Sequence, residues 1–252
     1  MPDNSASQQR FYDRTAEYVA VLIPSAWQGL GPALGRALDG LDTALGPVVD
    51  VGAGTGEGTV AIAQALPATE ILAVEPHPSL RTALLARLAS GNGLPGRVTV
   101  LGEDILSATL PEQISGLVAM NVIGHLTPAE RNALWTLLAE RLAPRGRAVL
   151  NIYPPTRPES VPSTPMSETT LGRRLYTASA SAEPAGTDSV TWHMTYRIVD
   201  NGTVVNEFTA SDLWHVFTSE ELSEELIEHD LHLTSVDADH GLHVITHAGE
   251  GA

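Results

Sequence analysis

Residues 48–57 of the chain read VVDVGAGTGE. Three of the first four residues of this stretch are valine, which is typical of a strand that is buried on both faces. The glycines that follow, Gly52, Gly54 and Gly56, let backbone amides approach a ligand closely and aim the N-terminus of the next helix at it. The stretch therefore predicts a strand, a glycine-rich loop and a helix that together bind an anionic group.

Short apolar runs alternate with longer amphipathic segments beyond this loop. We expect strands at residues 48–51, 71–74, 98–101, 117–120 and 148–152, and helices at about 57–66, 78–90 and 128–142. Such alternation is typical of a parallel sheet covered by helices on both faces. The expected fold class is α/β: a doubly wound, mostly parallel seven-stranded sheet with an N-terminal helical lid and an added antiparallel hairpin.

The segments on either side of this alternation give weaker signals. Residues 9–23 and 26–40 read as two helices that are broken at Pro24 and Ser25. Residues 154–187 are rich in Pro, Ser, Thr, Gly and Ala, which predicts a long loop or lid that does not continue the sheet. Asp200-Asn201-Gly202 predicts a turn between hairpin strands at 190–199 and 203–216, and a helix at 218–229 precedes closing strands at 231–236 and 242–247.

Two kinds of ligand compete for the glycine-rich loop: the pyrophosphate of a dinucleotide, or the methionine carboxylate and ribose of S-adenosylmethionine. A dinucleotide loop, G-x-G-x-x-G, requires glycine at position 57, where this chain has Glu57. A negative side chain at that position would face the pyrophosphate. The spacing G-x-G-x-G therefore favours the sulfonium cofactor.

The same residues give the chain a resemblance to the class I S-adenosylmethionine-dependent methyltransferases, in particular the small-molecule, natural-product type. The first motif of that family, an apolar strand ending in D-x-G-x-G-x-G, is matched by Asp50, Gly52, Gly54 and Gly56. Glu75, at the end of the second predicted strand, stands where the family holds the ribose hydroxyls, and a carboxylate suits a vicinal diol.

The resemblance extends over about residues 46–152. It implies that Asp104 accepts from the adenine amino group, that Ile105 packs on the adenine ring, and that Asn121 lines the methionine end. Residues 142–147, LAPRGR, are similar to the family's L-x-P-G-G turn, with Arg145 in place of the first glycine. The implied cofactor is S-adenosylmethionine, with S-adenosylhomocysteine as the product.

Composition limits the classes of partner. The 252 residues carry a formal net charge of -16, which repels the phosphate backbone of nucleic acids. The chain has no cysteine, no stretch near the roughly 20 apolar residues of a membrane span, and an N-terminus without the layout of a signal peptide. We therefore expect a cytoplasmic protein with a small-molecule acceptor and with neither nucleic acid nor membrane as partner; a homodimer stays open.

Methyl transfer needs a nucleophile aligned opposite the sulfur, and a base only where the nucleophile must lose a proton. The candidates for catalytic groups are His125, just after the fourth strand, and Tyr153, at the end of the fifth. The alternative for His125 is a residue that caps or packs against the next helix, and the alternative for Tyr153, which the sequence favours, is a residue that merely finishes the strand. The candidates for acceptor contacts are aromatic: Tyr12, Tyr18, Trp27, Trp192 and Trp214. They favour an aromatic or indole-like acceptor, and core packing is their alternative explanation.

The domain organisation expected from these assignments has four parts. They are a helical lid at 1–45, a cofactor-binding core at 46–153, a loop and hairpin over the acceptor site at 154–217, and a C-terminal helix and strands that complete the sheet at 218–252.

Three other functions stay open at this level. They are an S-adenosylmethionine-binding cyclase on the same fold, a non-catalytic binding module, and a nicotinamide oxidoreductase, which Glu57 disfavours. The nine histidines form no H-E-x-x-H motif and no tight cluster, so no metal is expected.

Overall fold

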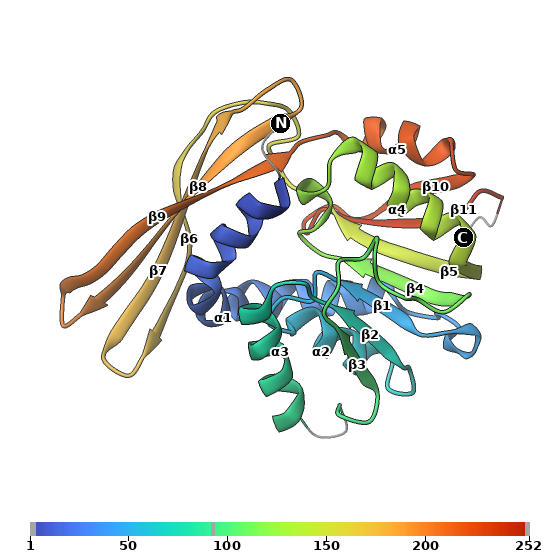
Figure 1. Ribbon diagram of the computed structural model, residues 1–252, viewed down its shortest axis with the longest axis horizontal. Coiled ribbons are helices and arrows are strands. Elements are labelled where there is room, and N and C mark those ends of the chain that lie inside the picture. Colours follow the sequence, from blue (N-terminus) through green and yellow to red (C-terminus); the bar gives the residue numbers. More distant parts are fainter. Residues whose placement is uncertain (1–3, 92–93, 250–252) are drawn as a thin grey trace. The chain divides into compact units, whose positions relative to one another are not determined.

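The computed structural model describes residues 4–91 and 94–249 (Figure 1). The chain forms two compact units. The core unit comprises Gly29–Tyr153 and the chain from Phe217 onward, and the insertion unit comprises the chain up to Gln28 and Pro154–Val216.

The core unit is built on a seven-stranded sheet, as predicted. Its strand order is β10-β11-β5-β4-β1-β2-β3. The parallel strands are β1 (Val48–Val51), β2 (Ile71–Val74), β3 (Val98–Leu101), β4 (Ile114–Ala119) and β5 (Leu142–Asn151). The antiparallel strands β10 (Leu231–Asp237) and β11 (Leu242–His247) extend the sheet beyond β5.

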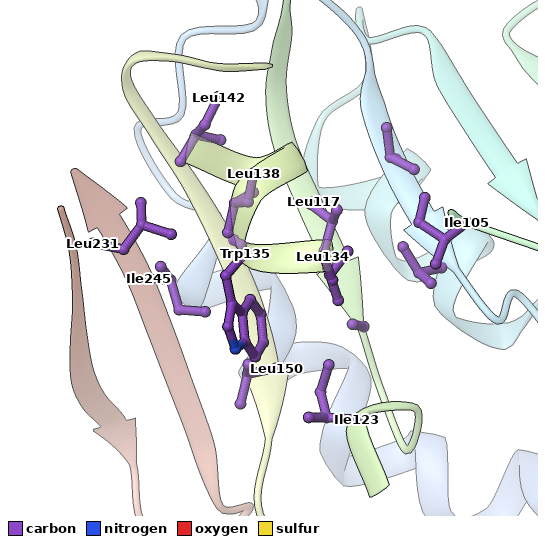
Figure 2. Packing of buried hydrophobic residues seen from close by; sticks show 14 of the residues in the cluster. Ile105, Leu117, Ile123, Leu134, Trp135, Leu138, Leu142, Leu150, Leu231 and Ile245 are labelled. Atoms are coloured by element: carbon purple, nitrogen blue, oxygen red, sulfur yellow. The ribbon is translucent and has the colours of Figure 1, made fainter. Parts of the chain in front are cut away.

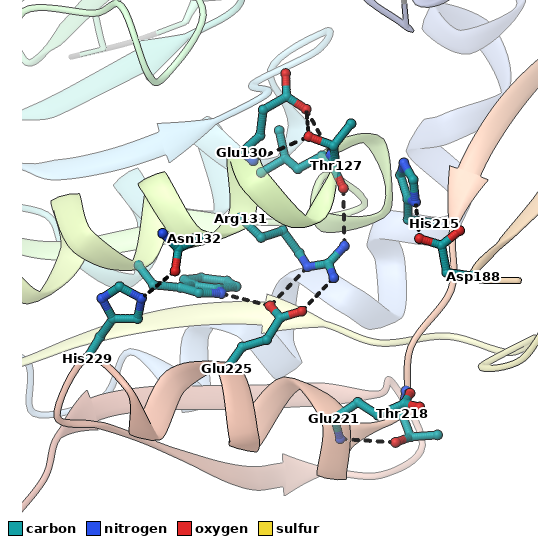
Figure 3. Close-up of polar contacts among 12 residues, drawn as sticks. Thr127, Glu130, Arg131, Asn132, Asp188, His215, Thr218, Glu221, Glu225 and His229 are labelled. Carbon is teal, nitrogen blue, oxygen red and sulfur yellow. Dashed lines mark hydrogen bonds and ion pairs between the residues drawn. The ribbon is translucent and has the colours of Figure 1, made fainter. Parts of the chain in front are cut away.

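Four helices of the core unit begin close to the predicted positions. They are α2 (Glu57–Ala65), α3 (Pro78–Ser90), α4 (Pro128–Arg141) and α5 (Ser219–Ile227); the short 3-10 helices are η1 (Thr43–Leu45) and η2 (Ile123–His125). Both predicted capping boxes are present, Thr127 with Glu130 and Thr218 with Glu221. The buried Arg131 joins α4 to Glu225 of α5 through two hydrogen bonds, Nε to Oε2 at 3.0 Å and Nη2 to Oε1 at 2.5 Å (Figure 3).

The sheet is covered on both faces because alternate residues of each strand point in opposite directions. Val49, Val51, Leu72 and Val74 belong to a large cluster that contains Trp135 of α4 and Leu222 of α5. Figure 2 shows Trp135 and its α4 neighbours lying over the apolar side chains of the strands. Residues on the opposite face, such as Ala73, pack instead against Leu84 and Leu88 of α3.

The insertion unit contains a four-stranded antiparallel sheet of order β6-β7-β8-β9. Its strands are β6 (Val161–Leu171), β7 (Arg174–Pro184), β8 (Ser189–Asp200) and β9 (Thr203–His215). The expectation of a loop over residues 154–187 was therefore wrong. Pro162 and Pro165 lie in the edge strand β6, beside irregularities in its register, where a missing backbone N–H costs little.

The predicted hairpin is present and forms β8 and β9. Its two-residue turn consists of Asn201 and Gly202, both with positive φ (50° and 80°), as the sequence predicts. One face of the hairpin is polar, with His193 bonded to Ser211 and Thr195 bonded to Thr209 across the strands. The other face carries the aromatic side chains.

The first helix, α1 (Asn4–Ala37), is continuous through Pro24, so the expectation of two separate helices was also wrong. A proline inside a helix costs about 3 kcal/mol, chiefly by removing one hydrogen bond and crowding the preceding turn. Burial of Leu22 and Leu30, on either side of Pro24, offsets this cost. None of the helices within residues 4–91 and 94–249 is long and apolar enough to cross a membrane.

Candidate active site

The predicted cofactor residues gather at one edge of the core sheet. Because β1, β2, β4 and β5 are parallel, their carboxyl ends lie at the same edge. The glycine-rich loop follows β1, Glu75 follows β2, Asn121 closely follows β4, and Tyr153 closely follows β5. The site is therefore built by strands that the buried core holds in register.

The glycine-rich loop requires its glycines. Gly52, Gly54 and Gly56 all have φ between 57° and 96°, a conformation that other residues rarely adopt. A Cβ on Gly52 would lie 2.7 Å from Cγ2 of Val122, and a Cβ on Gly56 would lie 2.8 Å from Cδ1 of Leu84. The loop thus packs closely against the segment after β4 and against α3.

Glu75 is tied to this loop. Its side chain is buried, and its two carboxylate oxygens accept hydrogen bonds from the backbone amides of Gly54 (2.8 Å) and His77 (2.7 Å). Burial raises the pKa of Glu75, and the two amide hydrogen bonds act against that rise. A carboxylate has about four acceptor positions, so two amide donors leave room for a diol.

Asp50 lies one residue before the end of β1 and is buried. Its Oδ2 accepts a hydrogen bond of 2.5 Å from Oγ1 of Thr59 on α2. Burial raises the pKa of Asp50 to about 7, the Thr59 hydrogen bond opposes the rise, and the nearby Glu75 adds to it. Asp50 therefore ties β1 to α2, the two elements that the glycine-rich loop connects.

The sequence-based argument against a dinucleotide assumed that the negative charge of Glu57 would face the ligand. In the structure, that charge is paired within the protein. Glu57 is buried, forms an ion pair with Arg87 of α3, and accepts a hydrogen bond of 2.5 Å from Oγ1 of Thr55. Arg87 also donates from Nε to the carbonyl oxygen of Thr55 at 2.8 Å. Arg87 thus neutralises Glu57 and clamps the loop at the same time.

The adenine candidates follow β3. Asp104 is exposed, and its carboxylate accepts hydrogen bonds from the amides of Leu106 and Ser107 and from Oγ of Ser107. Ile105 is buried in the large cluster on the α4 and α5 face. The turn that carries both residues is therefore well defined, while their contacts with adenine stay predictions.

Asn121 adopts a left-handed backbone conformation with φ of 57°. Its backbone amide donates to Oδ1 of Asn151 at 2.6 Å, and Nδ2 of Asn151 donates to Oδ1 of Asn121 at 2.8 Å. Asn151, the last residue of β5, also hydrogen-bonds to the half-exposed Tyr153. Burial raises the pKa of Tyr153, and this hydrogen bond partly opposes the rise.

His125 ends η2, in the segment that contacts the glycine-rich loop through Val122. Its backbone amide donates to the carbonyl oxygen of Val122 at 2.8 Å. The histidine is partly buried and follows Asn121 by four residues at the same edge of the sheet. Its role as a base stays a prediction.

The aromatic residues expected to contact the acceptor occupy several environments. Tyr18 is 2% exposed, packs against both Tyr196 and Phe208, and receives a hydrogen bond of 2.7 Å from Asn206. Core packing in the insertion unit therefore accounts for it without a ligand. The other four are partly buried: Tyr12, Trp27, Trp192 and Trp214, of which the last two lie against Val190 and Val216.

Three residues of the site are not indicated by any sequence pattern: Thr59, Arg87 and Asn151. Each acts from another element of the fold, so only the tertiary structure brings it to the site. Within residues 4–91 and 94–249, no group of three or more His, Asp or Glu side chains is arranged to hold a metal ion.

These residues fit S-adenosylmethionine. The backbone of the glycine-rich loop turns at Gly52, Gly54 and Gly56 with positive φ, and Glu75 presents a buried carboxylate bonded to the loop. Asp104 and Asn121 lie on turns after β3 and β4. A dinucleotide is a poorer fit, because the position of the third fingerprint glycine is filled by the Glu57 ion pair.

Comparison with known proteins agrees with this fit. Residues 48–146 match a family model described as a methyltransferase domain. No curated protein sequence matches the chain significantly.

Solved structures share the fold at low sequence identity. CalS10 of Micromonospora echinaspora, an amino pentose methyltransferase solved with S-adenosylmethionine, is 19% identical, with a TM-score of 0.71 over 88% of this chain and 92% of that one. DesVI of Streptomyces venezuelae is 19% identical, with a TM-score of 0.71 over 98% and 100%. The sugar N-methyltransferase KedS8 of a Streptoalloteichus species is 17% identical, with a TM-score of 0.65 over 86% of each chain.

The family match, the D-x-G-x-G-x-G loop and the carboxylate after β2 lead to one conclusion. Residues 48–146 are the methyltransferase domain of a class I, Rossmann-like S-adenosylmethionine-dependent enzyme, with S-adenosylmethionine as its cofactor and S-adenosylhomocysteine as the product.

Proposed function

We propose that the protein methylates an amine nitrogen of a small molecule, with an amino sugar as the acceptor. The observation that carries the proposal is the whole-chain similarity to CalS10, described as an amino pentose methyltransferase, and to KedS8, described as a sugar N-methyltransferase. Each match covers at least 86% of this chain, more than the core unit alone provides, so the shared fold includes residues of the insertion unit.

The environment of Tyr18 weakens the case for an aromatic acceptor. Tyr18, Tyr196 and Phe208 pack against one another in the core of the insertion unit. Packing therefore accounts for Tyr18, one of the five aromatic residues on which the preference for an aromatic or indole-like acceptor rested.

We assign the cofactor contacts residue by residue. Glu75 binds the ribose hydroxyls, the loop of Gly52, Gly54 and Gly56 receives the methionine and ribose, Asp104 and Ile105 contact adenine, and Asn121 lines the methionine end. When bound, the sulfonium supplies an electrophilic methyl group. The residues of the chain supply orientation and exclude water.

An amine acceptor sets a further chemical requirement. Most aliphatic amines are protonated at neutral pH, and only the neutral form has a lone pair that can attack the methyl carbon. A base that removes this proton is useful, and we assign that role to His125 because it lies at the cofactor edge of the sheet. Tyr153, beyond β5, is the second candidate and would orient the acceptor by hydrogen bonding. The net charge of -16 also favours a cationic acceptor.

The test is a methylation assay with S-adenosylmethionine and a panel of amino sugars, the corresponding sugars without the amine, indoles and catechols. Mass spectrometry of the products identifies the acceptor and the methylated atom. The proposal predicts methylation of amino sugars only. Methylation confined to indoles or catechols would contradict it.

His125→Ala tests the base. We expect turnover at pH 7 to fall by roughly 10²- to 10⁴-fold, the usual contribution of a general base, with little change in cofactor affinity. His229→Ala is the matched control, because His229 is bonded to Asn132 outside the site. Unchanged turnover in the His125 variant would remove His125 from the mechanism.

A further inference from the structure

We propose that Asn151 is a positioning residue: it holds the segment after β4 in the conformation that lines the methionine end of the cofactor. This inference rests on the proposed cofactor site, because it concerns the geometry of Asn121 within that site. Asn151 itself need not touch the cofactor.

The two asparagines form a closed pair of hydrogen bonds. The side-chain amide of Asn151 accepts from the backbone N–H of Asn121 at 2.6 Å and donates to the side-chain oxygen of Asn121 at 2.8 Å. Asn151 is 7% exposed, whereas Asn121 is exposed. The buried partner thus fixes both the backbone and the side chain of the exposed one.

Asn121 needs such support because its φ is 57°. Asparagine tolerates this left-handed region better than most residues but still prefers other conformations. A backbone N–H held by a buried acceptor resists a change of φ at this position. The following residue, Val122, packs against Gly52, so the same restraint also acts on the glycine-rich loop.

Asn151 can provide this restraint because its own strand is fixed on both sides. Strand β5 pairs with β4 on one side and with β11 on the other, where Asn151 is opposite Leu242. A side chain mounted on the middle of a sheet is positioned more accurately than one mounted on a loop.

The same amide reaches a third residue. The hydrogen bond between Asn151 and Tyr153 acts to lower the pKa of Tyr153, so Asn151 is the donor. Asn151 therefore links the residue that lines the cofactor to the aromatic residue we place near the acceptor. Its loss should affect both.

The test is a double-mutant cycle in which calorimetry measures the affinity for S-adenosylhomocysteine. Asn151→Ala is expected to weaken binding at least tenfold. In the Asn121→Gly background, where the left-handed conformation is easily adopted and the partner side chain is gone, the same change is expected to weaken binding less than threefold. Equal losses in the two backgrounds, or no loss in either, would overturn the proposal.

A second variant separates positioning from folding. Asn151→Asp keeps an acceptor for the amide of Asn121 but removes both donors, so we expect binding within threefold of wild type and a higher pKa for Tyr153. That pKa is measured by NMR of tyrosine labelled at the ring carbon that bears the hydroxyl, with Tyr153→Phe for assignment. An unchanged pKa of Tyr153, or binding as weak as in Asn151→Ala, would count against the role.

Asn132→Ala is the matched control, since Asn132 lies exposed on α4 and should leave affinity unchanged. Failure of the wild-type protein to bind S-adenosylhomocysteine would instead overturn the cofactor site itself. The two failures are therefore distinguishable.

Discussion

Glu75 accepts a hydrogen bond of 2.8 Å from the backbone amide of Gly54, so the carboxylate after β2 is bonded directly to the loop after β1. The same side chain accepts from the amide of His77 at 2.7 Å. A group proposed to bind the ribose is thus already oriented by its own loop. This preorganisation lowers the cost of ordering the site when the cofactor binds.

The buried Asp50 predicts a particular dependence of stability on pH. Its pKa is about 7 in the folded protein and near 3.8 when unfolded, so between these values the folded state binds more protons than the unfolded state. Stability from this group is present at low pH and is lost as the pH rises from about 4 to about 7. At 1.36 kcal/mol per pH unit, the loss is at most about 4 kcal/mol.

Asp50→Asn should remove this dependence while keeping an acceptor for Thr59. We expect the variant to gain stability relative to wild type as the pH is raised from 5 to 8, measured by urea unfolding. A constant difference between the two proteins over that range would contradict the pKa assigned to Asp50.

Because Glu57 and Arg87 form an ion pair, we expect the effects of mutating them on the unfolding free energy to be non-additive. Arg87→Met leaves the buried Glu57 without its partner, which should cost about 3 kcal/mol of unfolding free energy. Adding Glu57→Gln should recover most of this loss. Cofactor affinity should stay reduced in both variants, because the hydrogen bond from Arg87 to the carbonyl of Thr55 is gone.

Denaturant unfolding and calorimetry measure the two effects separately. If the double variant is no more stable than Arg87→Met, then the unpaired charge of Glu57 is not what lowers the unfolding free energy of the single variant. If affinity recovers along with stability, then Arg87 does not clamp the loop.

Because Glu225 of α5 contacts α4, we expect mutation of this one glutamate to lower the unfolding free energy much more than mutation of its acidic neighbours. Glu225 bonds to Arg131 twice and accepts from Nε1 of Trp135 at 3.0 Å. Glu225→Ala should cost about 3 to 5 kcal/mol, because it leaves the guanidinium of Arg131 buried without a carboxylate. Its exposed neighbour Glu224 is the control, and Glu224→Ala should change the unfolding free energy by less than about 0.5 kcal/mol. Similar effects at the two positions would show that the contact contributes little.

The central sheet could be predicted because its signals are local. The apolar runs at 48–51, 71–74 and 98–101 coincide with β1, β2 and β3, and Thr127 and Thr218 mark the starts of α4 and α5. Each of these elements combines strong periodicity or capping with burial, so local preference and tertiary packing agree.

The errors arose where packing overrides a local rule. Pro24 is tolerated inside α1 because buried leucines lie on both sides of it, and Pro162 and Pro165 are tolerated in β6 because it is an edge strand. The position of a strand at an edge is a property of the whole sheet, so residues 161–171 could not be identified as a strand from their composition.

The cofactor residues proposed from the motif lie at one edge of the core sheet. The residues that hold them in place, such as Asn151 and Arg87, could not be predicted from the sequence. Asn151 lies 30 residues from Asn121, and Arg87 lies 30 residues from Glu57. Such pairs have no characteristic spacing in the sequence. They depend on strand order and on the way α3 packs beside the loop.

Calorimetric titration of the purified protein with S-adenosylmethionine and with NAD, repeated on Glu75→Ala and on the exposed Glu70→Ala, tests whether Glu75 and the glycine-rich loop form the cofactor site. We expect micromolar binding of S-adenosylmethionine by the wild type and by the Glu70 variant. We also expect at least a tenfold loss in Glu75→Ala and no binding of NAD. Equal affinity in Glu75→Ala and wild type, or binding of NAD in place of S-adenosylmethionine, would contradict the cofactor site described for this protein.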